Sequence, residues 1–592
     1  RRGICVREGV EKMLRKVLYI DLSSRESWIE ERLDLFEDWM GGTGVGIKLL
    51  QEECPAGTDP LSPQAPIILS IGPLNGFFPV ATKTVATFKS PLTGELGESY
   101  AGGRLSLALR FAGHEAVVIR GRAERPAYIS INDADVKVKD ATSIWGIDAQ
   151  TTGVILREHE TGVGRRSIIR IGPAGEKLVR FAGVVVDTYR HFGRLGLGAV
   201  FGSKMLKALV VSGTEHADVP DARRYREVYS RLYSTIVKTD VMEKYHDIGT
   251  SVNINVLNWL KGLPTKNFIL SSFSEGEKIS GEMFADNYLF RRLSCAGCPI
   301  GCVHIAALKS AFSTHHEFEL RKVSYDYEPI YSLGSNLGVS TAEGILRLID
   351  VCERMGMDVM SAGVVLSWAT EAMERGLITT KETMDIPFQW NNVEGYSRAL
   401  ESIVKPPNEF YSALAMGVDY AAKKYGGREF AMALGKNEVS GYHTGPASIV
   451  GQLVGVRHSH LDNAGYSIDQ KAAKRSMDPE MMVDEIIKED NSRGVFNSLV
   501  GCLFARGVYT EENIIDALGA VGITKTKDDL QSLGRRIFEE KYKFKIQEGF
   551  DLSHAHIPKR FYETVSTLGI VAPETIEEML RQYKKKRGWG PG

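Results

Sequence analysis

Three cysteines lie close together in the segment RRLSCAGCPIGCVH, which covers residues 291 to 304. Cys295, Cys298 and Cys302 have the spacing C-x2-C-x3-C, and the glycines and proline between them let the chain bend so that three sulfurs can converge. An iron-sulfur cluster normally takes four cysteine thiolates, and the fourth can come from a distant segment. The spacing therefore predicts an iron-sulfur site that another part of the chain completes.

The remaining cysteines of the chain are the candidates for this fourth ligand: Cys5, Cys54, Cys352 and Cys502. Cys502 is favoured because it lies in the glycine-flanked turn NSLVGCLFARG. A structural zinc site of three cysteines and His304 is the alternative. Zinc sites usually pair a C-x2-C with a second knuckle of similar form, which the sequence lacks, so we expect an iron-sulfur cluster.

Two other segments share one spacing of polar residues. In ERMGMD, Glu353 and Asp358 stand five positions apart around Gly356, and in NSLVGC, Asn497 and Cys502 have the same separation. Each segment alone is typical of a helix end whose polar groups are already satisfied. Together they indicate a pair of equivalent ligand-binding segments.

Glycine-rich loops occur at residues 41–53 (GGTGVGIKLLQEE) and 193–204 (GRLGLGAVFGSK). The first follows a predicted helix instead of a strand, and the second lacks the glycine order of a P-loop, so neither predicts a nucleotide site. Both loops, together with Gly102 and Gly103 in GESYAGGR, can present backbone amides to phosphate. Close packing of the backbone explains such glycines equally well.

The composition excludes several classes of protein. Lys and Arg number 73 against 74 Asp and Glu, which argues against nucleic acid as a partner. No apolar run of about 18 residues is present, so we expect no membrane span, and the start lacks the features of a secretory signal, so we expect a cytoplasmic location. Residues 1–12, which precede Met13, are expected to be an extension outside the fold.

The elements that must position these residues divide the chain. Short β-prone runs between glycine and proline turns, such as TVATFKSPLTG and AVVIRGR, fill the first 215 residues. From about residue 220 the apolar periodicity is helical, as in GILRLIDVCERMG, which ends at a glycine suited to a left-handed cap. We expect an α+β protein with a β-rich domain at 13–215, a helical domain carrying the cysteine segment at 216–420, and a helical C-terminal domain at 421–592 that supplies the fourth cysteine.

A collinear series of motifs resembles the aldehyde ferredoxin oxidoreductase family of tungsten-pterin enzymes from about Met13 to the C-terminus. The series runs KSPLTG, AGGR, GRLGLGAVFGSKMLKAL, CAGCPIGC, DYEPIYSLGSNLGV and ERMGMDVMSAG. The resemblance implies a β-rich base domain that binds a bis-pterin cofactor of tungsten or molybdenum, covered by two mainly α-helical domains, with a 4Fe-4S cluster and magnesium. It implies oxidation of an aldehyde to a carboxylic acid, with electrons passing through the cluster to ferredoxin or an iron-sulfur partner subunit, in a homodimer or a larger redox complex.

The resemblance also assigns individual residues by position. The cluster ligands are Cys295, Cys298, Cys302 and Cys502. The catalytic pair is Glu328 and His460, and His458 is the nearest rival for the histidine. The cofactor-binding residues are Lys83, Tyr100, Gly102, Gly103, Arg190, Gly193, Arg194, Gly196, Gly198, Glu353, Asp358, Asn497 and Gly501.

Both pterin-binding segments depart from the family pattern. Glu353 and Asn497 stand where an aspartate is usual, and Val500 and Gly501 invert the usual Gly-Leu. We expect pterin binding to survive these changes.

Lys83 and Asp462 are further departures. Lys83 stands where family members usually have an arginine that bridges cluster and pterin, so the charge is kept but the planar fork of donors is lost. Asp462, two residues after His460, lies where a basic residue is common. The substrate preference of well-studied members therefore does not transfer.

Two other functions remain open from the sequence. One is a tungsten-bearing subunit of a larger complex that catalyses a different low-potential reduction, such as that of an aromatic thioester. The other is an iron-sulfur relay subunit without an active metal. Retention of Lys83, Glu353 and Asp358 disfavours the relay, because a relay needs only the cysteines.

Overall fold

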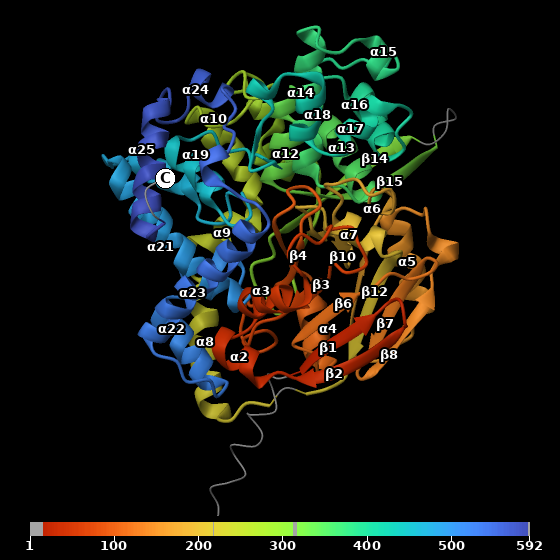
Figure 1. Ribbon diagram of the computed structural model, residues 1–592, viewed down its shortest axis with the longest axis vertical. Helices are drawn as coiled ribbons and strands as arrows, with labels where there is room; N and C mark the ends of the chain where they lie inside the picture. Colours follow the sequence, from red (N-terminus) through yellow and green to blue (C-terminus); the bar gives the residue numbers. More distant parts are fainter. Residues whose placement is uncertain (1–15, 217, 312–316, 590–592) are drawn as a thin grey trace, which may run out of the picture.

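The computed structural model describes residues 16–216, 218–311 and 317–589. The proposed extension at 1–12 and Cys5 lie outside these residues. Figure 1 shows two β-sheets at the lower right, with helices covering them from above and from the left. The expected α+β class, with a β-rich N-terminal part and a helical remainder, is confirmed. The exact domain boundaries stay a prediction.

The first sheet has six strands of mixed direction in the order β2-β1-β6-β3-β4-β5. The strands are β1 (Lys16–Asp21), β2 (Glu26–Glu31), β3 (Ile67–Ser70), β4 (Thr84–Lys89), β5 (Leu96–Ala101) and β6 (Ala116–Arg120). The central strands are covered on both faces, and their sequences are therefore almost entirely apolar. All residues of β3 are buried, as are the first four of β6.

The second sheet also has six strands, in the order β11-β10-β9-β12-β7-β8. The strands are β7 (Ala127–Asn132), β8 (Asp135–Asp140), β9 (Arg165–Arg170), β10 (Val184–Val186), β11 (Arg190–Phe192) and β12 (Leu206–Gly213). The two sheets share one apolar core, to which Leu69, Ile119, Ile129 and Leu209 contribute. Their last strands, β5 and β11, contact each other, and both carry candidate site residues.

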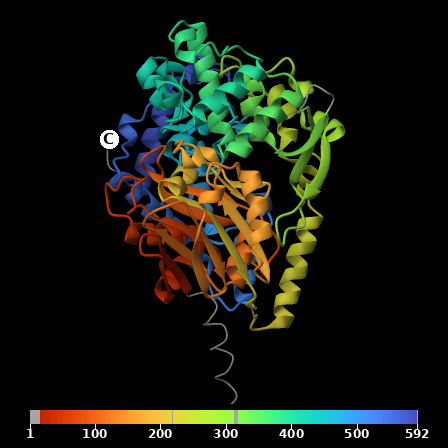
Figure 2. The same cartoon turned by 90° about the vertical axis from the view of Figure 1, so that its right-hand side faces the viewer.

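The region expected to be helical contains a small sheet that the sequence analysis did not predict. It consists of the antiparallel strands β13 (Leu289–Leu293), β14 (Val303–Ala311) and β15 (Phe318–Tyr325). Figure 2 shows it at the side of the molecule, above α8 (Ala222–Val237). The cysteine segment is therefore the connection between two strands and does not lie between helices.

Helices from distant parts of the chain cover the base domain. Above the sheets lie α12 (Tyr327–Leu333), α13 (Ala342–Met355) and α14 (Val359–Glu374). As expected, α13 ends at Gly356 with a left-handed φ of 76°.

The C-terminal helices cover the base domain from the other side. The helices α21 (Pro479–Ser498) and α23 (Lys527–Gln547) pack against each other and against α3 (Gly42–Glu53) of the base domain. The glycine loop at 41–53 is thus a buried helix, and a Cβ on Gly42 would lie 2.5 Å from the carbonyl oxygen of Asn497. Close packing accounts for this glycine-rich segment.

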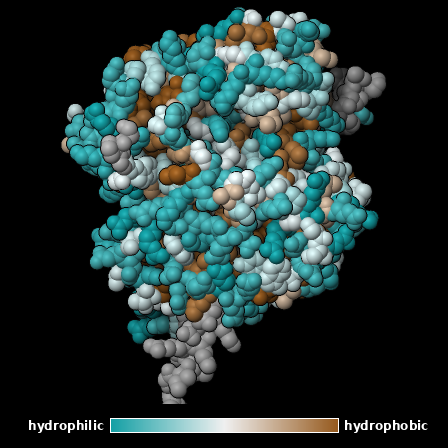
Figure 3. Space-filling model, viewed as in Figure 1, coloured by the Kyte–Doolittle hydropathy of each residue, from teal (hydrophilic) through white to brown (hydrophobic). Residues whose placement is uncertain are grey.

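The face of the molecule in Figure 3 is mostly hydrophilic, with hydrophobic side chains in small scattered groups. None of the helices within the described ranges combines the length and the apolar composition that crossing a membrane requires.

Candidate functional site

The cysteine segment is pressed against the end of the first sheet. A Cβ on Gly102 would lie 2.5 Å from the sulfur of Cys295, so only glycine leaves room for this thiol. The amide of Ala296 donates to the carbonyl of Gly103 at 2.9 Å. Gly102 and Gly103, which the resemblance assigned to cofactor binding, thus hold the cysteine segment in place.

Val80 joins the cysteine segment to the turn that carries Cys502. Its amide donates to the carbonyl of Gly297 at 3.1 Å, and its carbonyl accepts from the amide of Cys502 at 3.0 Å. The described cysteines are all free thiols. Of the other candidates, Cys54 and Cys352 are buried in the hydrophobic core, so Cys502 is the described cysteine that accompanies the three.

The thiols of this group lie within electrostatic reach of one another. Burial raises the pKa of Cys298 to about 12 and that of Cys302 to about 11, and the charges of the neighbouring thiolates add to both shifts. Without a cation such thiols stay protonated at neutral pH. A metal cluster supplies the positive charge that holds them as thiolates, so this donor set fits a 4Fe-4S cluster.

The zinc alternative fits poorly. His304 is buried, and its Nε2 lies 2.9 Å from the carbonyl oxygen of His246. Across the described part of the chain, no three His, Cys, Asp or Glu side chains converge closely enough to hold a single metal ion. A cluster with one iron for each cysteine allows its ligands to stand further apart.

The two segments with equal spacing are docked on the base domain in the same way. In one, Gly356 accepts from the amide of Gly183 at 2.9 Å, and Asp358 donates to the carbonyl of Phe181 at 2.9 Å. In the other, Val500 accepts from the amide of Lys83 at 3.1 Å, and Cys502 donates to Val80 at 3.0 Å.

The backbone conformation of the two segments also matches. Gly356 and Val500, at the fourth position of each, have left-handed φ angles of 76° and 46°. The two segments are therefore geometric equivalents, although the second places valine where the turn favours glycine.

A cavity of about 390 Å³ lies between the base domain and the helices that cover it, within the usual size range of ligand sites. Its wall includes most of the residues that the resemblance assigned: Lys83, Tyr100, Arg190, Gly193, Arg194, Glu328, Glu353, Asp358, His460, Asn497, Gly501 and Cys502. These residues come from both sheets and from both ends of the helical region, so only the folded chain brings them together.

Two of the assigned glycines are not part of the cavity wall and pack closely against neighbouring backbone, so their role in cofactor binding stays a prediction. A Cβ on Gly196 would lie 2.1 Å from the carbonyl oxygen of Arg180, and one on Gly198 would lie 2.4 Å from that of Gly183. These contacts fit close packing of α7 (Leu197–Ser203) on the neighbouring backbone.

Glu328 and His460 face each other in the cavity. Nε2 of His460 is 3.3 Å from Oε1 of Glu328, and the hydroxyl of Tyr442 donates to the same oxygen at 3.2 Å. Burial alone would raise the pKa of Glu328, but the hydrogen bond and charge of His460 outweigh it, so the pKa is lowered. Glu328 is therefore ionised at neutral pH.

His458, the rival histidine, has other partners. Its Nε2 is 3.0 Å from Oε2 of Glu95 and 3.0 Å from Nζ of Lys545. All three side chains are buried, and His458 is not part of the cavity wall. Of the two histidines, His460 is therefore the one that lies beside Glu328 in the cavity.

Asp326 is a cavity residue that the sequence analysis did not single out. Burial and the charge of Glu328 raise its pKa to about 7, against the opposing charges of Arg190 and Lys83. It precedes α12 but its carboxylate does not cap that helix. The signal was present in SYDYEP, where this aspartate stands two residues before Glu328.

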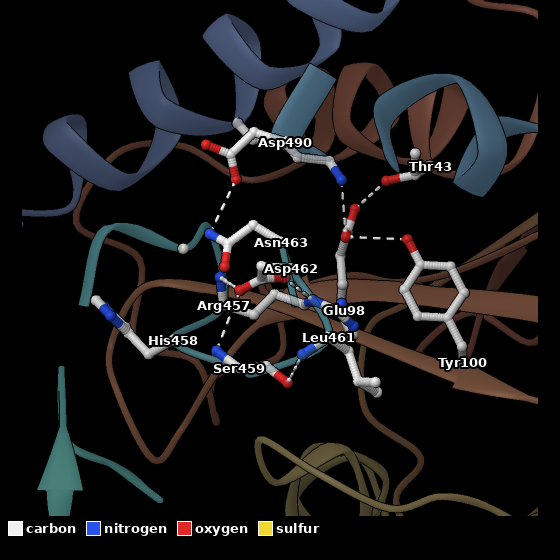
Figure 4. A network of polar contacts seen from close by, with 12 residues as sticks. Thr43, Glu98, Tyr100, Arg457, His458, Ser459, Leu461, Asp462, Asn463 and Asp490 are labelled. Atoms are coloured by element: carbon white, nitrogen blue, oxygen red, sulfur yellow. Dashed lines mark hydrogen bonds and ion pairs between the residues drawn. The ribbon is translucent and has the colours of Figure 1, made fainter. Parts of the chain in front are cut away.

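Asp462, a departure from the family pattern, has its hydrogen-bond partners in its own loop. It accepts from the backbone amides of Arg457 and Ser459 at 3.0 and 3.1 Å, and from Nε of Arg457 at 2.7 Å. Figure 4 shows this turn, with Arg457 reaching toward Glu98 and Tyr100. Asp462 thus stabilises the loop that carries His460, and Arg457 of the same loop lines the cavity.

Several polar atoms of the cavity wall are buried and have no hydrogen-bond partner among the residues described: Nη1 of Arg194, Nε2 of His191, Oε2 of Glu353 and Nδ1 of His460. Burial, with the charges of Asp350 and Asp326, holds the pKa of Glu353 well above its usual range. Such unsatisfied groups fit a large polar ligand. A pterin cofactor meets that description.

Asp358 behaves differently from Glu353. Its carboxylate accepts from the amide of Met360 at 3.0 Å, which caps α14, and from Nε of Arg194 at 3.0 Å. It therefore orients Arg194, which is part of the cavity wall and whose buried Nη1 has no hydrogen-bond partner among the described residues.

Arg190 lies between the cavity and the thiols. Burial would lower its pKa, but the charges of Cys295 and Cys302, with those of Asp326 and Cys502, outweigh this and raise it. The charge of Lys83 also acts on Cys302. Two cations thus lie where the resemblance leads us to expect a single bridging residue.

Comparison with known proteins identifies the relatives of this chain. Family models described as "Aldehyde ferredoxin oxidoreductase, N-terminal domain" and "Aldehyde ferredoxin oxidoreductase, domains 2 & 3" match residues 17–213 and 227–592. The tungsten-containing aldehyde ferredoxin oxidoreductases of Pyrococcus furiosus and Thermococcus kodakarensis are 33% and 32% identical to it, over 97% of this chain and 96% of each relative. The WOR-like subunit of an aliphatic sulfonate oxidoreductase of P. furiosus is 29% identical over 66% of this chain and 64% of that relative.

A solved structure shares the fold. The active-site complex BamBC of benzoyl coenzyme A reductase, in complex with 1,5-dienoyl-CoA, contains a chain that superposes with a TM-score of 0.83. The match covers 98% of this chain and 95% of the other, at 21% identity.

Proposed function

The chain belongs to the aldehyde ferredoxin oxidoreductase family, and from this membership we propose that it oxidises an aldehyde to the carboxylic acid in the cavity at Glu328 and His460. One observation carries the proposal. The wall that holds this acid-base pair also contains Cys502 and Lys83, so the site of substrate oxidation and the exit for electrons adjoin.

The family implies a tungsten-pterin cofactor, and the residues of the cavity wall fit it. Glu353, Arg194 and Asn497 would hold the pterins, with Asp358 orienting Arg194. When bound, this cofactor would supply the two-electron redox chemistry, which no side chain of the chain provides.

The protein's own residues handle the carbonyl group and the protons. Oxidation of an aldehyde by water yields a carboxylate, two electrons and three protons. Because Nε2 of His460 is engaged by Glu328, the unpartnered Nδ1 is the atom that can donate to the carbonyl oxygen of the substrate. The ionised carboxylate of Glu328 stabilises the protonated imidazole and accepts a proton released in the reaction.

Cys295, Cys298, Cys302 and Cys502 would hold a 4Fe-4S cluster, which would supply the exit for electrons. Arg190 and Lys83, whose charges act on these thiols, would stabilise added negative charge there. Ferredoxin or an iron-sulfur partner subunit would then accept the electrons at the surface. Exposed Arg291 and Arg292 on β13 suit an acidic acceptor.

A relay subunit without an active metal explains less of the structure. A relay has no use for a cavity of about 390 Å³ with unpartnered polar atoms in its wall. Magnesium binding, molybdenum in place of tungsten, the oligomeric state and a cytoplasmic location stay predictions.

A panel of aldehydes with a dye as electron acceptor tests the proposal. We expect aldehyde-dependent dye reduction by the protein purified with its cofactors. Replacement of Glu328 by Gln should lower kcat by about 10²-fold, the usual effect of losing an acid-base group, without loss of metal. Unchanged kcat in Glu328→Gln would contradict the assigned role.

A further inference from the structure

The cavity has a buried inner end and a solvent-exposed mouth. His460 and Tyr442 are buried, Phe504 and Tyr245 are half-buried, and Arg506 is exposed, yet all five line the same cavity. The acid-base pair therefore lies at the inner end, and Arg506 lies at the mouth. A substrate that reaches His460 keeps its opposite end near Arg506.

Aromatic rings line the space between these two ends. The rings of Tyr245 and Phe504 are stacked with centroids 4.0 Å apart, and those of Tyr442 and Tyr466 are 4.2 Å apart. Tyr442 also lies 5.1 Å from the ring of His460. Flat aromatic faces favour a flat aromatic ligand, because ring-ring contact adds to the gain from burying apolar area.

The mouth of the cavity carries more positive charge than the neighbouring carboxylates neutralise. Arg493 pairs with Glu489 at 3.1 Å. Arg506 makes a hydrogen bond of 2.8 Å to the carbonyl of Leu503, and it has no ion pair with any residue in the described ranges. Exposed Lys244 adds a second charge, with its Nζ 5.4 Å from the ring centre of Tyr245.

Arg506 is also close to the aromatic lining. Burial raises the pKa of Tyr466, and the charge of Arg506 is the largest influence that opposes this shift. A cation beside an aromatic slot is suited to a ligand that joins a ring to an anionic group.

We propose that this mouth selects aromatic aldehydes that carry an anionic group on the side of the ring opposite the carbonyl. The carbonyl would meet His460, the ring would lie along the stacked aromatic pairs, and the anionic group would face Arg506. The inference rests on the proposed function, because it places the carbonyl of an aldehyde at His460.

Equilibrium binding of carboxylates to the holoenzyme tests this selectivity without turnover. Titration calorimetry would compare benzoate, benzene-1,4-dicarboxylate and the aliphatic hexanedioate. We expect the aromatic dicarboxylate to bind about fivefold more tightly than benzoate, the scale of one exposed charge pair, and more tightly than hexanedioate. Raising the salt concentration to about 0.5 M should reduce the first difference, because exposed charges are screened.

Two variants locate the effect. Arg506→Gln should bring the ratio of the two aromatic affinities close to one. Arg226→Gln on α8 is the matched control, because Arg226 is also exposed and also donates to a local backbone carbonyl; it should keep the ratio. A ratio near one in the wild type, no detectable binding of the aromatic dicarboxylate, or an unchanged ratio in Arg506→Gln would overturn the inference.

The test distinguishes a failure of the mouth's selectivity from a failure of the proposed function. Tighter binding of the aromatic dicarboxylate in a protein that oxidises no aldehyde would uphold the selectivity of the mouth and contradict the proposed function. If the protein oxidises aldehydes but binds the aromatic dicarboxylate no more tightly than benzoate, the proposed function is upheld and the selectivity of the mouth is contradicted. Equal binding of hexanedioate and benzene-1,4-dicarboxylate would overturn the aromatic part of the inference.

Discussion

The backbone amide of Cys502 donates a 3.0 Å hydrogen bond to the carbonyl of Val80, whose own amide donates to Gly297 in the cysteine segment. A single residue of the base domain thus joins two parts of the helical region that are far apart in sequence. Asp358 forms the equivalent bond to Phe181 at 2.9 Å. The base domain is therefore the template on which the predicted cluster and pterin segments are assembled.

Replacement of Cys502 by Ala should remove one cluster ligand. We expect the iron content to fall, or the reduced cluster's paramagnetic signal to disappear or convert to that of a three-iron species. Iron analysis and electron paramagnetic resonance of the purified variant measure this. Cys352→Ala is the control, because Cys352 is buried in α13, and it should keep the full iron content. An unchanged four-iron signal in Cys502→Ala would remove Cys502 from the ligand set.

Replacement of Lys83 or Arg190 by Met should lower the reduction potential of the cluster, because each removes a positive charge that favours the more negative, reduced state. A shift on the order of 1 kcal/mol, which is about 40 mV for one electron, is expected for a charge at this range. Redox titration of the cluster signal measures it. Lys83→Arg keeps the charge and should keep the potential. If both Met variants titrate like the wild type, neither cation acts on the cluster.

Replacement of His460 by Ala should lower kcat by about 10²-fold or more and leave the metal content intact. Steady-state kinetics with an aldehyde and a dye acceptor measure this. His458→Ala is the informative comparison, because His458 is tied to Glu95 and Lys545 in the core. We expect His458→Ala to lower the melting temperature and to lower kcat by much less than the 10²-fold expected for His460→Ala. A large loss of kcat in His458→Ala with full activity in His460→Ala would reverse the two assignments.

Replacement of Asp326 by Asn should stabilise the protein more at pH 8 than at pH 5.5. The pKa of Asp326 is raised from 3.8 to about 7 in the folded state by burial and by Glu328, so folding becomes less favourable as the pH rises between these values. Asn removes this penalty. Thermal unfolding should show a melting temperature gain about 1 to 2 °C larger at pH 8. An equal gain at both pH values would show that Asp326 does not titrate in this range.

Local sequence signals predicted the strands of the base domain and the equivalence of the two equally spaced segments well. The β-prone runs became β3, β4, β6, β7, β9 and β12, because their β-branched residues are bounded by glycine and proline turns. The equal spacing of Glu353–Asp358 and Asn497–Cys502 predicted two equivalent segments, since the left-handed turn at the fourth position is a local property.

Tertiary contacts explain what the sequence analysis missed. The strands β13 to β15 are stabilised by cross-strand pairing, which is not encoded in a local helical period. Tyr442 is 114 residues from Glu328 in the sequence and reaches it only in the folded chain. Asp326 is a sequence neighbour of Glu328, but its raised pKa depends on burial in the folded chain.

Some glycines of the predicted phosphate loops, such as Gly42 and Gly198, are closely packed against backbone, whereas Gly193 lines the cavity with open space beside it. The sequence could not separate these two uses, because both require the absence of a side chain.

The most direct test of the central claim is aldehyde-dependent dye reduction by natively purified protein whose metals have been counted. We predict about one tungsten and about four iron atoms per chain, together with dye reduction by at least one aldehyde of the panel. Iron without tungsten or molybdenum and without aldehyde oxidation would contradict the account and indicate an electron-relay subunit.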